Sequence, residues 1–105
     1  GPRQMESADG AGMPTPVRRR FRIGGRVQMV GFRMYAVVHA NRLALCGRVR
    51  NLPGGEVEVL AEGPPAAMSE FSAVLELGPA LAEVTSFLVS EEPPGPPLGV
   101  FVEER

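Results

Sequence analysis

The chain contains no lysine and no tryptophan, only one cysteine and one histidine, and no long apolar run. The single cysteine, Cys46, excludes an intramolecular disulfide and fits a reducing compartment. One histidine cannot form a cluster of His and Cys metal ligands, so no metal site of that kind is expected. No apolar run approaches the roughly 20 residues needed to span a bilayer, and the N-terminus lacks the apolar region of a signal peptide. These absences together predict a cytoplasmic protein.

An excess of basic charge is also missing. Eleven arginines face twelve acidic residues, which gives a net charge of −1. Such a balance provides no general attraction to nucleic acid or to an anionic membrane, so neither is expected as a partner. A length of 105 residues with 44% hydrophobic content is typical of one globular domain, and a monomer is expected by size.

Two regions differ in composition. Residues 1–16 are rich in Gly, Pro, Ser and Ala and show no hydrophobic periodicity, which predicts a disordered tail. Residues 17–105 contain the periodic segments and form the predicted domain.

Hydrophobic periodicity in residues 17–105 predicts five strands and two helices. The predicted strands cover 17–23, 48–51, 56–63, 82–90 and 99–103, and the predicted helices cover 32–43 (or 45) and 64–77. The order β-α-β-β-α-β plus a terminal strand is typical of the ferredoxin-like split βαβ sandwich, an α+β fold in which two helices cover one face of a mostly antiparallel sheet. This arrangement permits Asn51, at one strand end, to lie near the segment 25–33.

The segment 24–33 carries the clearest chemical signal. It leads from a strand through three glycines into the start of a helix. Such a junction directs backbone N–H groups and the positive end of the helix dipole to one place. Arg33 lies in the first helical turn, and its planar guanidinium suits a group of phosphate oxygens. The segment therefore predicts an oxyanion site.

Other polar residues favour structural roles. Arg18, Arg19 and Arg20 suggest nucleic-acid binding or a solvated strand face, and the lack of interleaved aromatics favours the second. His39 lies roughly 240° around the helix from Arg33, which favours a partly exposed structural position. Cys46 is interpreted as a small buried hydrophobe, because no base is in evidence to activate it. An RNA-binding domain of the same fold would need stacking aromatics on its sheet, and aromatics make up only 6% of the chain.

Two motifs resemble the signatures of a known family. Residues 25–33, GRVQMVGFR, resemble the acylphosphatase pattern G-x-V-Q-G-V-x-F-R. Residues 45–58, LCGRVRNLPGGEVE, resemble its second pattern, L-x-G-x-V-x-N-x-x-x-G-x-V-E. The interval between them also matches, and the resemblance covers about residues 18–103. It implies hydrolysis of acyl phosphates to a carboxylate and inorganic phosphate, without metal or cofactor.

The resemblance also implies the roles of individual residues. Arg33 would hold the phosphate, and Asn51 would orient the attacking water. The phosphate-binding loop would comprise Gly25, Val27, Gln28, Met29, Val30, Gly31 and Phe32.

The chain departs from the family pattern at two positions. Met29 stands where the family has glycine, and Arg48 stands where an aromatic residue is common. A left-handed backbone at Met29 would cost roughly 1–2 kcal/mol. Two hypotheses therefore remain: an active enzyme whose partners are a small-molecule acyl phosphate as substrate and inorganic phosphate or sulfate as product or analogue, or a weak or inactive module of the same fold that binds phosphate or an acidic partner.

Overall fold

The structure is a computed structural model that describes residues 15–104. Five strands and two helices follow one another in the predicted order. They are β1 (Val17–Arg26), α1 (Phe32–Arg42), β2 (Cys46–Asn51), β3 (Val57–Gly63), α2 (Pro65–Leu77), β4 (Glu83–Glu91) and β5 (Val102–Glu104).

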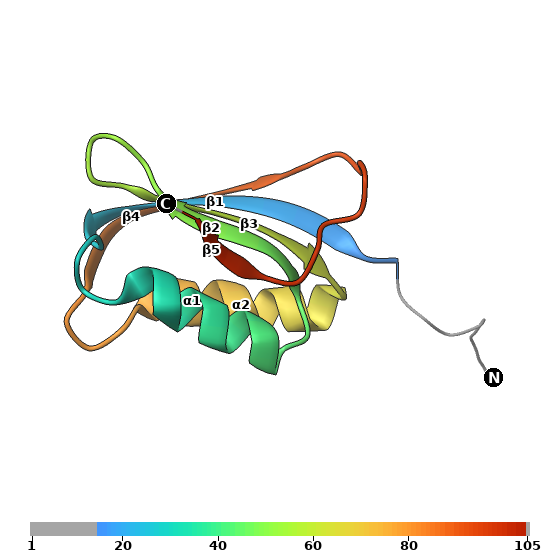
Figure 1. Cartoon of the computed structure of the whole chain (residues 1–105), viewed down its shortest axis with the longest axis horizontal. Helices are drawn as coiled ribbons and strands as arrows, with labels where there is room; N and C mark the ends of the chain where they lie inside the picture. Colours follow the sequence, from blue (N-terminus) through green and yellow to red (C-terminus); the bar gives the residue numbers. More distant parts are fainter. Residues whose placement is uncertain (1–14, 105) are drawn as a thin grey trace.

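The strands form one sheet in the order β4-β1-β3-β2-β5. All neighbouring strands are antiparallel except β2 and β5, which are parallel. Both helices lie against the same face of the sheet (Figure 1). The ferredoxin-like α+β fold predicted from the sequence is confirmed.

The core lies between the helices and this face of the sheet. The alternation of strand residues places Phe21, Ile23, Val57 and Val59 on the helix side, where none of them is exposed to solvent. Each helix contributes a stripe of buried residues spaced three or four apart: Phe32, Ala36, Ala40, Met68, Phe71 and Leu75. Phe21 and Phe71 pack edge to face with ring centroids 6.1 Å apart, which joins β1 to α2.

A bulge interrupts the pairing of β1 with β4. Gly24 pairs with Ser86, but Gly25 pairs with Val84, so Thr85 has no partner in the register. Gly25 has φ 118°, and a Cβ there would collide with the Glu83 carbonyl oxygen. As a result β4 does not alternate strictly: Val84 and Phe87, an odd number of residues apart, both pack against the core.

Helix α1 ends in a Schellman motif that contains no glycine. The amide of Leu45 donates to the Ala40 carbonyl at 2.8 Å, and the amide of Ala44 donates to the Asn41 carbonyl at 3.1 Å. Ala44 takes the left-handed position with φ 58°. The predicted end at Leu43 or Leu45 is therefore slightly late, because this turn closes the helix at Arg42.

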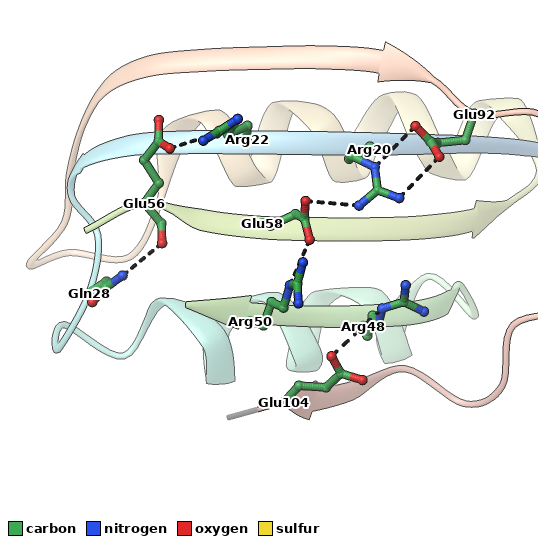
Figure 2. A network of polar contacts seen from close by, with 9 residues as sticks. All are labelled: Arg20, Arg22, Gln28, Arg48, Arg50, Glu56, Glu58, Glu92 and Glu104. Carbon is green, nitrogen blue, oxygen red and sulfur yellow. Dashed lines mark hydrogen bonds and ion pairs between the residues drawn. The ribbon is translucent and has the colours of Figure 1, made fainter. Parts of the chain in front are cut away.

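Ion pairs cover the opposite face of the sheet, as Figure 2 shows with the helices behind. Glu58, on the central strand β3, binds Arg20 at 3.0 Å and Arg50 at 2.9 Å. Burial alone would raise the pKa of Glu58, but hydrogen bonds from Arg50 and Arg20 outweigh it, and the pKa lies below its ordinary value. Arg20 also pairs with Glu92, and this hydrogen bond lowers the pKa of Glu92.

The arginine cluster of β1 is also paired with acidic residues, Arg18 and Arg20 on this face and Arg19 on the helix side. Arg18 lies 2.8 Å from Glu62, and Arg19 lies 2.6 Å from Glu91. Each arginine of the cluster thus has an acidic neighbour on an adjacent segment, and the predicted solvated face is largely covered, since the three side chains are only 11%, 25% and 32% exposed.

The remaining differences from prediction concern element ends. β1 extends to Arg26, and β2 begins at Cys46. β5 is shorter than predicted and begins at Val102, while Val100 forms only an isolated bridge with Cys46. The predicted tail over 1–16 lies almost wholly outside the described residues. Within residues 15–104, neither helix is long and apolar enough to cross a membrane.

Candidate active site

A cavity of about 160 Å³ lies where β1 passes into α1 and where β2 ends. Eight residues from four parts of the chain line it: Val27, Met29, Gly31, Phe32, Arg33, Met34, Asn51 and Glu103. Six of them were predicted as site residues from the sequence. The fold therefore brings Arg33 and Asn51, which are far apart in sequence, to one cavity.

The loop between β1 and α1 supplies free backbone donors. Met29 has φ 62° and Gly31 has φ 82°, so the loop turns twice through the left-handed region. Among residues 15–104, the amides from Met29 to Met34 donate to no backbone carbonyl, whereas the amide of Tyr35 donates to Gly31 O at 3.0 Å. The unpaired amides of residues 31–34 are those expected at the N-terminus of a helix, and those of Met29 and Val30 belong to the preceding loop. An anion in the cavity would meet these donors and the positive end of the helix dipole.

Arg33 reaches the cavity from the first turn of α1. One terminal nitrogen of its guanidinium donates to the Glu104 carbonyl oxygen at 2.8 Å. Its Nε lies 3.4 Å from Glu103 Oε2. Both contacts come from β5, and the side chain remains 30% exposed. β5 therefore holds the guanidinium at the cavity while other N–H groups of its fork stay available to an anion.

Asn51 occupies the last position of β2. Its Oδ1 atom is buried and accepts no hydrogen bond from the described residues. A buried acceptor without a partner costs free energy, so such an atom is usually explained by a role at a site. Asn51 also lines the cavity, as a neutral side chain on the same lining as the cationic Arg33.

Gln28 holds the loop in place. Its Nε2 donates to Leu52 O at 2.9 Å and to Glu56 O at 2.8 Å, both in the turn between β2 and β3. Figure 2 shows Gln28 beside the backbone of Glu56. These bonds join the loop that carries the amides to the turn that follows Asn51, so Gln28 stabilises the relative position of the two halves of the site.

Three predicted loop residues lie outside the cavity lining. Gly25 belongs to β1 and forms the bulge, Gln28 directs its amide to the neighbouring turn, and Val30 packs against the core. His39 and Cys46 are also not among the lining residues: His39 packs on the ring of Tyr35, and Cys46 is half-buried at the start of β2.

Sequence reasoning did not identify Glu103 and Met34 as lining residues. Glu103 reaches the cavity because β5 pairs with β2 in parallel, opposite Val49. That pairing has no local sequence signal. Met34 was detectable in principle, since it follows Arg33 in the first turn of a helix whose N-terminus was already assigned to the site.

Comparisons with known proteins agree with this geometry. The Acylphosphatase family model matches residues 19–102. An acylphosphatase of Alkalilimnicola ehrlichii is 49% identical over 84 residues, which cover 80% of this chain and 94% of the relative. An acylphosphatase of Synechococcus sp. WH7803 is 49% identical over 79 residues, which cover 75% of this chain and 79% of the relative.

A solved structure agrees as well. The crystal structure of acylphosphatase from Bacillus subtilis matches with a TM-score of 0.82 and 34% identity, covering 85% of this chain and 99% of that chain. The match of the family model over residues 19–102, the shared fold and this level of identity lead to one conclusion: the chain belongs to the acylphosphatase family.

Proposed function

We propose that the cavity between the β1–α1 loop, Asn51 and β5 is where this acylphosphatase hydrolyses acyl phosphates. Arg33 and the free amides of residues 29–34 bind the phosphoryl oxygens. Asn51 orients the water that attacks phosphorus. The observation that carries the proposal is that one cavity is lined by Arg33, the loop and Asn51 together.

The phosphoryl group carries negative charge that is redistributed in the transition state. A guanidinium and backbone amides that are already fixed in place stabilise such charge without reorganising. Arg33 is held from behind by Glu104 O, and the loop is anchored through Gln28. The donors are therefore preorganised before substrate binds.

Asn51 provides the second part of the reaction. Its side-chain amide lines the cavity and forms a hydrogen bond with a water placed opposite the acyl oxygen. The water oxygen bonds to phosphorus, the bond from phosphorus to the acyl oxygen breaks, and the electron pair leaves with the carboxylate. The water proton passes to an oxygen of the phosphate. Because a carboxylate is a good leaving group, positioning and charge stabilisation suffice, and neither a strong base nor a metal is required.

The left-handed backbone of Met29 favours one alternative. A non-glycine residue there stores strain in the loop, and a distorted loop would bind phosphate without turnover. The alternative is therefore a binding module that uses the same donors.

Turnover by the unmodified protein separates these functions. Benzoyl phosphate is incubated with the protein in the presence of a chelator, and the release of inorganic phosphate is followed. Turnover that saturates with substrate and is inhibited by phosphate or sulfate supports the enzyme. Binding of phosphate in a calorimeter without any turnover contradicts it and supports the module.

The proposal also includes the setting in which the protein works. We expect the protein to work in the cytoplasm and as a monomer. A monomer is sufficient for this chemistry, because every proposed site residue comes from one chain. Analytical ultracentrifugation at assay concentration tests the monomer, and a species of twice the mass would contradict it.

A further inference from the structure

Met29 combines two unfavourable features. Its backbone is left-handed, with φ 62°, and its side chain is 99% exposed. A left-handed backbone is costly for a residue with a Cβ, and an apolar side chain in water gains nothing from packing. Local strain without a compensating contact is found most often at functional sites.

Met34 is a second exposed methionine. It lies in the first turn of α1, and it is 56% exposed. Both methionines line the same cavity as Arg33 and Asn51. The lining therefore combines three polar side chains, Arg33, Asn51 and Glu103, with two exposed methionines, Met29 and Met34.

We propose that Met29 and Met34 form a binding subsite for the acyl group, and that the preferred substrates are acyl phosphates with a large apolar acyl group. This inference rests on the proposed function, because the phosphoryl group must bind in the same cavity. An acyl phosphate combines the same two kinds of surface, because a charged phosphate group is joined to an acyl group. Methionine side chains are flexible and polarisable, so they adapt to aliphatic and aromatic tails alike.

Selectivity follows from the difference in apolar surface that each substrate can cover. The methyl group of acetyl phosphate covers little of either methionine, whereas the ring of benzoyl phosphate covers part of both. Removal of this surface from water strengthens binding of the larger substrate in proportion to its area. The gain applies to the ground state and the transition state alike, and it therefore appears in KM more than in kcat.

The test compares two substrates in matched variants. Met29→Gln and Met34→Gln keep the length of each side chain but replace the thioether by an amide. We expect each to lower the benzoyl-to-acetyl ratio of kcat/KM by about fivefold, and the double variant by about 20-fold, mainly through KM. Any change in the loop that affects both substrates equally cancels in the ratio. Val38→Gln is the control, because Val38 is 54% exposed on α1 but does not line the cavity.

A binding measurement separates the subsite from catalysis. Benzylphosphonate and methylphosphonate carry the same charged head and are not hydrolysed. Calorimetry on the unmodified protein should show tighter binding of benzylphosphonate, and this difference should shrink in the double variant.

The outcomes are distinct. Absence of turnover with both substrates overturns the proposed function, while the phosphonates still report on the subsite. Turnover with a substrate ratio that stays within twofold in all variants, or a change of the same size in Val38→Gln, overturns the subsite and leaves the proposed function intact.

Discussion

Arg33 and Glu103 form an ion pair inside the cavity, with Nε of the arginine 3.4 Å from Oε2 of the glutamate. The two side chains are 30% and 36% exposed, so the carboxylate is partly screened by water. A negative group thus lies beside the cation that we assign to the phosphate. Glu103 and the phosphate should therefore compete for Arg33.

This competition predicts the effect of Glu103→Gln on phosphate binding. Removing the charge leaves the contact from Arg33 to the Glu104 carbonyl in place. The inhibition constant of inorganic phosphate should fall by about three- to tenfold, which corresponds to roughly 1 kcal/mol for one charge at partial exposure. The constant is measured by product inhibition of benzoyl phosphate hydrolysis.

Glu104→Gln provides the matched control. The side chain of Glu104 pairs with Arg48 at 3.8 Å, and only its backbone carbonyl binds Arg33. The constant should therefore stay within twofold in this variant. A higher inhibition constant of phosphate in Glu103→Gln would instead mean that the carboxylate mainly positions Arg33. It would contradict the proposal that Glu103 and phosphate compete for Arg33.

Ala44→Gly should stabilise the protein. Ala44 occupies the left-handed position of the Schellman motif with φ 58°, where glycine has no Cβ penalty. Allowing for the larger entropy of glycine in the unfolded chain, the free energy of unfolding should rise by about 0.5–1 kcal/mol. Urea unfolding measures the change.

Met29→Gly tests the same argument at φ 62° and should give a similar gain. The comparison variant is Ala66→Gly in the first turn of α2, where glycine should cost about 0.5–1 kcal/mol. Loss of stability in both Ala44→Gly and Met29→Gly would show that the backbone is strained at neither position.

Glu58→Gln should reduce stability in a pH-dependent way. Because the folded pKa lies below the ordinary value of 4.5, the ionised carboxylate stabilises the folded state. This contribution is present above about pH 4.5 and is lost as pH falls through the lowered pKa. At pH 7 the variant should lose about 1–2 kcal/mol, since two arginines lose a charged acceptor.

The measurement for Glu58 is urea unfolding of both proteins from pH 7 to pH 3. The difference between them should shrink toward acid. A difference that is the same at every pH would mean that the ionisation of Glu58 contributes nothing.

Much of this molecule could be predicted from the sequence. Alternation in residues 17–23 and the stripe of Phe32, Ala36 and Ala40 reflect one buried face of each element, so local periodicity was enough for the fold. The two signatures were enough to propose Arg33 and Asn51 as one site, and both line the same cavity.

The rest depends on pairing between distant segments. The bulge at Gly25 is set by the register of β1 against β4, and Glu103 reaches Arg33 only because β5 lies next to β2. The backbone of Met29 was left open, since a methionine side chain does not determine the sign of φ. These features follow from tertiary contacts, which no local pattern encodes.

The central claim is that Arg33 binds the phosphoryl group and Asn51 orients the water. The most direct test is kcat/KM for benzoyl phosphate in Arg33→Ala and Asn51→Ala, with Arg42→Ala and Asn41→Ala as controls on the exposed end of α1. Circular dichroism and urea unfolding establish whether each of the four variants folds. We predict a loss of about 100-fold or more in both site variants and less than twofold in the controls. Retention of most activity by a folded Arg33→Ala or Asn51→Ala variant would contradict the account.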